Sequence, residues 1–287
     1  MTLANGSVAF DHHGRTVLVT GGANGLGRVI AEQFAASGAA VVAADIATSD
    51  GVESVRLLPG VIDKVRLDVA NEDSVRSLVE EASRRGTSFD VLVNNAGVMY
   101  KAAVQDVQAE HWRRALEVNV TGAMLCAKHV VPGMRQRGFG RLINISSMTA
   151  MIGMETYGAY SSSKAALGNL SRVWAAELAG DGITANSLCP GWLNTPMAAA
   201  ALVGHLAQIH GESAQAARER LLRAIPQRRL IEPEEVAAAA MFLATRLAAG
   251  INGAAIQIDT GLVETFAAGL HRRSVLSSVA PAALEGA

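Results

Sequence analysis

The chain of 287 residues lacks several features that would place it in a specialised class. Its two cysteines, Cys126 and Cys189, are too few for a disulfide framework. Its seven histidines are scattered and show no metal-ligand spacing, so we expect no bound metal. No apolar stretch is long enough to cross a bilayer, and residues 1–11 do not resemble a signal peptide. We therefore expect a soluble, cytoplasmic protein.

Charged residues are also scarce, at 18% of the chain, and the two signs nearly cancel to a net charge of −1. No basic stripe is present, so neither nucleic acid nor a membrane is an expected partner. Half of the residues are hydrophobic, which is enough apolar material for one large buried core. A small molecule is the expected partner.

Short apolar runs alternate with helix-like stretches along most of the chain. The runs lack the alternation of half-exposed strands, which is typical of strands buried on both faces of a parallel sheet. Strands are predicted at residues 16–20, 40–45, 65–67, 91–94, 141–146, 184–188 and 255–258. Helices are predicted at residues 26–37, 72–85, 109–137, 159–179 and 233–246. This order favours the α/β class: a single-domain Rossmann fold with a doubly wound, parallel, seven-stranded sheet and helices on both faces.

The predicted domain covers residues 1–261. It includes a helical stretch at residues 195–229 that contains no strand and stands in the position of a lid over the site. Residues 262–287 follow the last strand as a C-terminal tail.

A glycine-rich turn, residues 20–27, joins the first strand to the first helix. Gly21, Gly25 and Gly27 permit a sharp turn and a close approach of a pyrophosphate to the backbone at the helix N-terminus. A glycine pattern of this kind also occurs in ordinary turns, but its place between strand and helix favours a dinucleotide site.

Asp45 ends the second predicted strand. A carboxylate there accepts hydrogen bonds from adenosine ribose hydroxyls and repels a 2′-phosphate. Ile46 and Asn24 provide no positive charge for such a phosphate, so NAD is favoured over NADP as the cofactor. Asp68, at the end of the third strand, is placed near the adenine. The alternative for Asp45 is a solvated carboxylate at a strand end.

The chain resembles the short-chain dehydrogenase/reductase family over residues 14–261. The motifs that carry the resemblance are residues 20–27, Asp68, residues 94–97, Asn119, Ser146, Ser147, Tyr160, Lys164, Pro190, Gly191 and residues 252–253 with Asp259. It implies a catalytic set of Asn119, Ser147, Tyr160 and Lys164. It also implies that the cofactor contacts Gly21, Asn24, Gly25, Leu26, Gly27, Asp45, Asp68, Val69, Asn95, Ala96, Gly97, Tyr160, Lys164, Pro190, Gly191, Leu193 and Thr195. Thr260 stands where members commonly have glycine.

Tyr160 and Lys164 lie one helical turn apart, and Ser147 precedes them. A free tyrosine has a pKa near about 10 and is a poor base at neutral pH. An ammonium on the same helix face stabilises the phenolate, as does the oxidised nicotinamide ring. Tyr160 is therefore the predicted general base in alcohol oxidation and the acid in reduction. Tyr157 is a rival tyrosine, but Ser161 stands where its lysine partner would be.

The predicted substrate pocket is lined by Met99, Met148, Met154, Tyr157 and Trp192. This apolar set suits a fairly hydrophobic secondary alcohol or ketone, although methionines also fill ordinary cores. Residues 211–229 resemble the lid of 3-hydroxybutyrate dehydrogenases, yet the side chains of Met99, Thr149 and Tyr157 argue against a small hydroxy acid.

Two other functions remain open. The first is a 3-hydroxyacyl-CoA dehydrogenase or 3-oxoacyl reductase, with acyl-CoA phosphates docked on arginines of the lid, Arg218, Arg220, Arg223, Arg228 and Arg229. The second is an NAD-binding scaffold without catalysis, which would have no need of the complete catalytic set. Resemblance to the family also implies a homotetramer built on the helices at 109–137 and 159–179, with the tail at a further interface.

Overall fold

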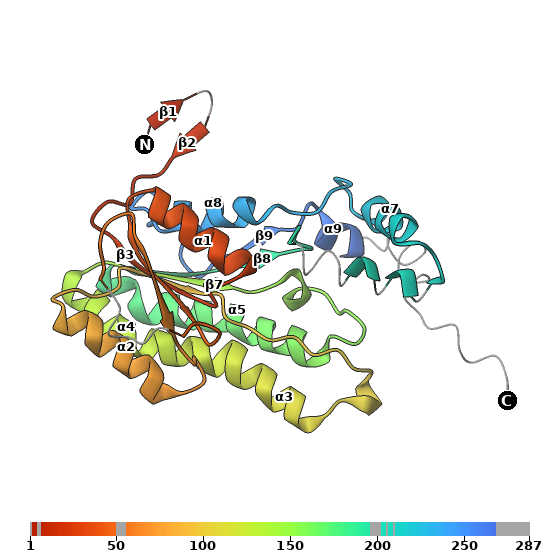
Figure 1. Cartoon of the computed structure of the whole chain (residues 1–287), viewed down its shortest axis with the longest axis horizontal. Helices are drawn as coiled ribbons and strands as arrows, with labels where there is room; N and C mark the ends of the chain where they lie inside the picture. The colour runs from red at the N-terminus through yellow and green to blue at the C-terminus, as the bar shows by residue number, and fades with distance from the viewer. Residues whose placement is uncertain are drawn as a thin grey trace.

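A sheet of seven parallel strands forms the centre of the protein, in the order β5-β4-β3-β6-β7-β8-β9 (Figure 1). The computed structural model describes residues 2–4, 7–49, 56–195, 202–204, 206–208 and 210–267. The strands are β3 (Thr16–Thr20), β4 (Ala40–Asp45), β5 (Ile62–Arg66), β6 (Val91–Asn94), β7 (Gly140–Ile145), β8 (Ile183–Pro190) and β9 (Ala255–Ile258). The predicted parallel seven-stranded Rossmann fold is confirmed.

Helices cover both faces of this sheet (Figure 1). On one face α1 (Gly25–Ala36) packs against α8 (Pro233–Leu243). The other face carries α2 (Glu72–Arg84), α3 (Ala109–Leu116), α4 (Gly122–Arg137) and α5 (Gly158–Leu178). Each predicted helix is present, with ends that differ by a few residues.

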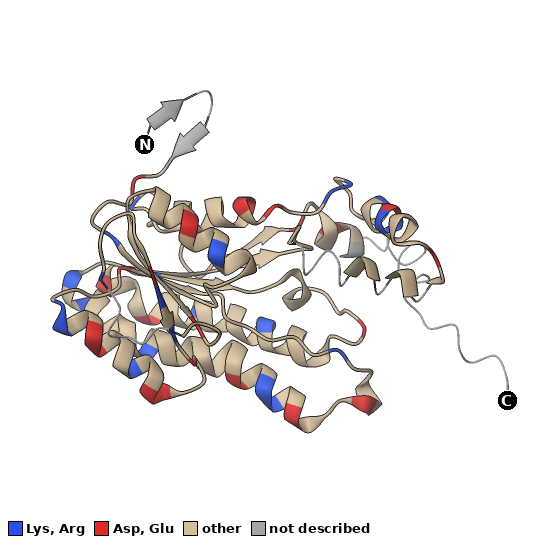
Figure 2. Cartoon of the chain, viewed as in Figure 1, with Lys and Arg blue, Asp and Glu red and all other residues tan. Residues whose placement is uncertain are grey.

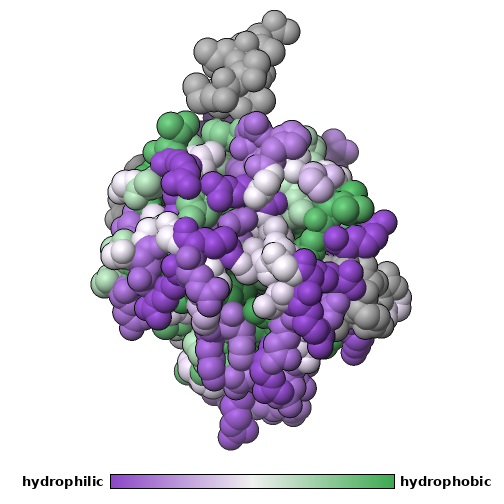
Figure 3. Space-filling model, turned by 90° about the vertical axis from the view of Figure 1, so that its left-hand side faces the viewer, coloured by the Kyte–Doolittle hydropathy of each residue, from purple (hydrophilic) through white to green (hydrophobic). Residues whose placement is uncertain are grey.

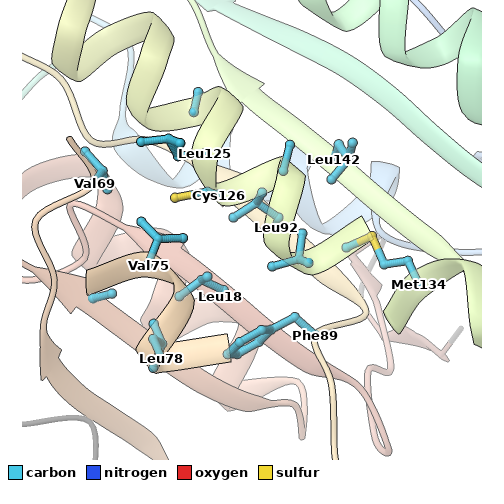
Figure 4. Packing of buried hydrophobic residues seen from close by; sticks show 14 of the residues in the cluster. Leu18, Val69, Val75, Leu78, Phe89, Leu92, Leu125, Cys126, Met134 and Leu142 are labelled. Carbon is cyan, nitrogen blue, oxygen red and sulfur yellow. The ribbon is translucent and has the colours of Figure 1, made fainter. Parts of the chain in front are cut away.

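Alternate residues of a buried strand supply the two halves of the core. Val17 and Val19 of β3 pack in the cluster with α1 and α8, whereas Leu18 between them packs with α2 and α4. Figure 4 shows the second cluster, in which Leu18, Leu92 and Leu142 from three neighbouring strands meet Cys126 of α4. Burial on both faces explains why the strands read as continuous apolar runs.

Strand β5 begins three residues before its predicted start. The prediction missed these residues because they include a charged residue, Asp63, in place of an apolar one. The side chain of Asp63 is buried, but its carboxylate accepts hydrogen bonds from the backbone N–H groups of Arg56 and Leu57 at 2.7 Å. The guanidinium of Arg56 also pairs with it at 3.0 Å. A carboxylate satisfied in this way is tolerated in a buried strand, which apolar patterning does not reveal.

The helix predicted at residues 109–137 is interrupted. A turn of π-helix at Glu117–Thr121 separates α3 from α4. Single π-turns of this kind often occur at functional sites, and this one contains Asn119. The helix predicted at residues 109–137 is therefore present as α3 and α4, joined by this π-turn.

The chain also has an N-terminal hairpin, β1 (Thr2–Ala4) with β2 (Ser7–Ala9), which was not predicted. The sequence signal was the pair Asn5-Gly6 between the two strands, a common hairpin dipeptide. At the other end of the domain, Thr260 has a φ of +58°, in the left-handed region that favours glycine. This conformation accounts for the glycine that family members commonly have there.

The stretch predicted as a lid contains α7 (Ala214–Ala224). Ser213 caps the N-terminus of this helix, and its hydroxyl accepts the backbone N–H of Ala216. A third apolar cluster joins this stretch to the site, and it includes Met148, Leu206, Ala217, Leu221, Ile225, Leu230, Leu262 and Val263. Leu262 and Val263 begin α9 (Leu262–Ala267), so the first residues of the predicted tail pack on the domain itself. Residues 268–287 lie outside the described residues.

Charges of both signs are spread over the outer faces of the helices (Figure 2). The face at the left of Figure 1 is mostly hydrophilic, with small apolar areas between (Figure 3). In the described part of the chain, no helix is both long and apolar enough to cross a membrane.

Leu92, which is fully buried in the central strand β6, is expected to carry a large share of core stability. Replacing Leu92 with alanine leaves a cavity and is expected to lower the free energy of unfolding by about 3 kcal/mol. Leu247→Ala is the matched control, because that side chain is 71% exposed and is expected to change stability by less than about 0.5 kcal/mol. Urea unfolding measures the free energy of unfolding of both variants. An equal loss of stability in Leu92→Ala and Leu247→Ala would contradict this account of the core.

Candidate active site

The site lies at the carboxyl ends of the parallel strands. β3 and β6 are neighbours in the sheet, but the chain winds outward from them in opposite directions. Such a reversal leaves a crevice beyond the strand ends, where α/β proteins bind their ligands. Gly21, Asp45, Asn95, Ser147 and Gly191 all follow or end strands at this edge.

The glycine turn between β3 and α1 has no room for a side chain at Gly21, Gly22 or Gly27. A Cβ on Gly27 would lie 2.1 Å from the carbonyl oxygen of Gly21 and 2.4 Å from Nδ2 of Asn95. Gly21 itself has a φ of +65° and lies against the backbone of Ala96. These close approaches allow the turn to fold tightly over the start of α1, leaving the N–H groups of that helix free for an anion.

Asn95 ties this turn to the neighbouring strand. Its Nδ2 donates to the carbonyl oxygens of Thr20 and Gly21, each at 3.0 Å. The hydroxyl of Thr20 accepts the backbone N–H groups of Asn95 and Ala96, both at 3.1 Å. The ends of β3 and β6 are thus held at a fixed spacing, which sets the width of the crevice.

Asp45 and Asp68 lie at one end of the crevice, in a cavity of about 240 Å³. One oxygen of Asp45 accepts the N–H of Ala23 at 3.1 Å, and the other accepts the N–H of Ala47 at 3.0 Å. Residues predicted to contact the cofactor form much of the wall, namely Gly21, Asp45, Asp68, Val69, Asn95, Ala96 and Gly97. Sequence reasoning missed Ile46 as a wall residue, and also Leu67, Val98, Arg114 and Val118, which carry no motif.

Asn119 reaches the crevice from the π-turn between α3 and α4. Its Oδ1 accepts the N–H of Val98 at 2.7 Å, and its Nδ2 donates to the carbonyl oxygen of Val98 at 2.9 Å. Nδ2 also lies 2.9 Å from the hydroxyl of Ser163 on α5. The π-turn therefore turns one amide toward both the strand end and the helix that carries Tyr160.

Lys164 and Tyr160 come from α5, and Ser147 follows β7. Lys164 is 3% exposed, and its Nζ donates to the carbonyl oxygen of Ile145 at 2.7 Å. Nζ lies 5.7 Å from the ring centroid of Tyr160. The hydroxyl of Ser147 accepts hydrogen bonds from the backbone N–H of Thr149 at 3.1 Å and from its hydroxyl at 3.0 Å. Three of the four predicted catalytic residues therefore converge on one point of the crevice.

Burial dominates the titration of the tyrosine and the lysine. It raises the pKa of Tyr160 to about 12, although a hydrogen bond with Ser147 lowers that pKa. Burial also lowers the pKa of Lys164 to about 8. Because both groups lose hydration, each neutral form is favoured. That Lys164 lowers the pKa of Tyr160 relative to a site without the ammonium stays a prediction.

Two further cavities continue the crevice beyond Gly97. One, of about 260 Å³, is lined by Leu26, Gly97, Ser147, Tyr160, Lys164, Pro190, Gly191 and Leu193 among others. The other, of about 230 Å³, shares Ser147, Tyr160, Gly191 and Leu193 with it. All five predicted pocket residues, Met99, Met148, Met154, Tyr157 and Trp192, line this second cavity.

The remaining predicted residues lie beside the crevice. Asn24, Gly25 and Gly27 shape the turn without lining a described cavity, and Thr195 follows the short bridge between Leu193 and Ile231. Sequence reasoning did not place Lys101 in the pocket, although this residue lines it. The signal for Lys101 was its position seven residues beyond the strand end at Asn94.

The arginines of the lid are largely engaged with acidic side chains. Arg220 binds Glu212 through two hydrogen bonds of 2.9 and 3.0 Å, and Arg229 likewise pairs with Glu235. Arg223 approaches Glu219 at 3.7 Å. This pairing favours a solvated helix face over a phosphate site. Within the described residues no group of three or more potential metal ligands occurs.

Comparison with known proteins identifies the chain's relatives. A family model described as enoyl-(acyl carrier protein) reductase matches residues 21–263. The cis-4-hydroxycyclohexanecarboxylate dehydrogenase of Sinomonas cyclohexanicum is 38% identical over 252 residues, which cover 86% of this chain and 96% of that relative. The 3-oxoacyl-(acyl-carrier-protein) reductase of Thermotoga maritima is 34% identical over 253 residues, covering 87% of this chain and 98% of the relative.

A solved structure shares the fold of this chain. Gluconate 5-dehydrogenase from Burkholderia cenocepacia J2315, in complex with NADP and tartrate, superposes with a TM-score of 0.78 at 30% identity. The match covers 89% of this chain and 98% of that one. A dinucleotide crevice that ends at Tyr160 and the buried Lys164 defines the class as a nicotinamide-dependent oxidoreductase. The chain belongs to the short-chain dehydrogenase/reductase family.

Gly27→Ala tests the glycine turn. Its methyl group would overlap the carbonyl oxygen of Gly21, so the turn must open and affinity for a nicotinamide dinucleotide is expected to fall more than about tenfold. Gly180→Ala is the control, because nothing lies within 4 Å of a Cβ there. Fluorescence titration with the reduced dinucleotide measures both variants. Unchanged affinity in Gly27→Ala would show that the turn does not hold the cofactor.

Proposed function

We propose that the protein interconverts a fairly hydrophobic secondary alcohol and its ketone, using NAD and with Tyr160 as general acid and base. The observation that carries this proposal is that Ser147 and Tyr160 lie where the two inner cavities meet, with Lys164 beside them in the wall of one. One cavity continues the dinucleotide crevice and the other has an apolar wall. An alcohol bound there has a proton acceptor on one side and a cofactor site on the other.

The crevice fits a dinucleotide on its own geometry. The tight turn at Gly21 and Gly27 suits a pyrophosphate, Asp45 suits the adenosine ribose, and the cavity beside Lys164 suits the nicotinamide half. The cofactor supplies hydride exchange and, in its oxidised form, a positive charge near the reacting carbon.

NAD is proposed rather than NADP because Asp45 ends β4 inside the adenosine cavity. Its carboxylate would repel a 2′-phosphate. The nearest cations are already engaged, since Arg114 pairs with Glu117 at 2.8 Å and Arg66 donates to the carbonyl oxygen of Ile46 at 2.6 Å. The gluconate 5-dehydrogenase structure holds NADP, so this choice distinguishes the chain from that relative.

The proton steps are assigned to residues of α5 and its neighbours. Ser147 holds the substrate oxygen beside Tyr160, which removes the hydroxyl proton in oxidation and returns it in reduction. Because burial raises the pKa of Tyr160 to about 12, the phenolate needs added positive charge. The ammonium of Lys164 is one source. Asn119, bonded to Ser163 of the same helix, connects the site to solvent through water.

The apolar wall supports a hydrophobic substrate body. Methionines 99, 148 and 154 together with Trp192 give it an adaptable surface. Reduction of a 3-oxoacyl thioester is the second candidate, favoured by similarity to the Thermotoga reductase. The paired arginines of the lid argue against docking of acyl-CoA phosphates there. A scaffold without catalysis is disfavoured, since it would have no need of Ser147, Tyr160 and Lys164 in one cavity.

The homotetramer stays a prediction. Large apolar side chains exposed on the two helices concerned, Met124 on α4 and Val173 on α5, support it, with exposed fractions of 37% and 42%. A cytoplasmic location likewise stays a prediction from composition.

Tyr160→Phe tests the proposed chemistry. Absorbance of the reduced cofactor is followed with NAD or NADP and a panel of secondary alcohols that includes hydroxyacyl thioesters. Wild-type protein is expected to turn over an apolar alcohol with NAD at least about tenfold better than with NADP. The variant is expected to lose at least about 100-fold in kcat while still binding NAD. Tyr157→Phe is the control and is expected to stay active. An equally active Tyr160→Phe variant would refute the assignment.

A further inference from the structure

Lys101 is the one charged side chain among the described residues that line the proposed substrate cavity. Lys101 stands in its wall together with Met99, Met154, Tyr157, Trp192 and Leu202. The polar groups that remain are hydroxyls and backbone near the reacting end, at Ser147, Thr149, Tyr160 and Gly191. The cavity wall therefore contains two kinds of polar group, the hydroxyl cluster and the single ammonium of Lys101, among apolar side chains.

The loop after β6 directs this lysine to the cavity. Met99 and Lys101 both line it, whereas Tyr100 between them stacks on His111 at a centroid distance of 4.3 Å. The backbone N–H of Ala102 donates to the carbonyl oxygen of Thr156 at 2.9 Å. The loop is thus fastened to the segment that carries Tyr157, and alternate side chains point to the site.

The ammonium of Lys101 has an aromatic neighbour and no acidic one among the described residues. Its Nζ lies 4.7 Å from the ring centroid of Tyr157, a cation–π distance. In contrast, Lys128 on α4 pairs with Glu72 at 2.6 Å. A cation without a carboxylate partner, held at the edge of an apolar cavity, is available to bind an anion from outside the protein.

We infer that Lys101 is a specificity-determining residue that binds a carboxylate of the substrate. This inference rests on the proposed function and narrows its substrate class to hydroxy and keto acids with an apolar body. The reacting oxygen lies at Ser147 and Tyr160, while the carboxylate lies at Lys101, beside the ring of Tyr157, whose centroid is 6.3 Å from that of Tyr160.

The test separates binding of the anion from turnover. Calorimetry measures the binding of cyclohexanecarboxylate and of its neutral isostere cyclohexanecarboxamide to the protein saturated with NAD. The variants are Lys101→Met, Lys101→Arg and, as a control, Lys128→Met. Wild-type protein is expected to bind the carboxylate more tightly than the amide. Lys101→Met is expected to weaken carboxylate binding about tenfold and amide binding less than about twofold. Lys101→Arg keeps the charge and is expected to retain most of the affinity.

Several outcomes would overturn the assignment. The first is that wild-type protein binds the amide more tightly than the carboxylate. The second is that Lys101→Met leaves the affinity for the carboxylate unchanged. The third is that Lys101→Met lowers the affinity for both ligands equally. Kinetics with a hydroxycyclohexanecarboxylate and its methyl ester add a second readout, in which Lys101→Met raises KM for the acid and leaves kcat nearly unchanged. Carboxylate binding through Lys101 without turnover of any alcohol would count against the proposed reaction and in favour of the anion site.

Discussion

The burial of one ammonium group is the constraint on which the site depends. Lys164 is fixed by a hydrogen bond to the carbonyl oxygen of Ile145, at the end of a central strand, while its own backbone carbonyl accepts the hydroxyl of Ser146. This pair of bonds fixes α5 to the end of β7. Tyr160, one turn earlier on the same helix, is thereby held over the crevice. A helix packed by apolar contacts alone would be free to shift along the sheet by small amounts, and proton transfer does not tolerate such shifts.

A buried chain of polar side chains extends this attachment through the sheet. Asn94 of β6 donates to Asn144 of β7 at 2.8 Å, Asn144 donates to Ser171 of α5 at 2.8 Å, and Ser171 meets Ser187 of β8 at 2.7 Å. Three strands and the catalytic helix are thus joined by directional contacts inside an apolar core. Such networks define a single register where hydrophobic packing would accept several. The cost of burying these polar groups is offset by precise placement of the site.

Much of the fold could be predicted from the sequence because strands buried on both faces must be apolar throughout, as β3 and β4 are. The glycine turn and the Tyr160–Lys164 pair were likewise visible as spacing. What could not be predicted depends on long-range partners. The place of Asp63 in a buried strand could not be predicted, because it depends on the backbone donors of Arg56 and Leu57. The direction in which the pKa of Tyr160 shifts depends on burial, which no local sequence pattern reveals. Lys101 carries no motif, and only the folded loop brings it to the pocket.

The most direct test of the central claim is the pH dependence of alcohol oxidation in wild-type protein and in Lys164→Met. Oxidation requires the phenolate, so kcat/KM is expected to rise with pH and level off above the effective pKa of Tyr160. Lys164 and oxidised cofactor should bring that midpoint well below the pKa of about 12 to which burial raises Tyr160. Removal of the ammonium is expected to move the midpoint upward by about one pH unit or more. A variant with the wild-type midpoint would contradict the assignment of Lys164 as the residue that sets the proton chemistry.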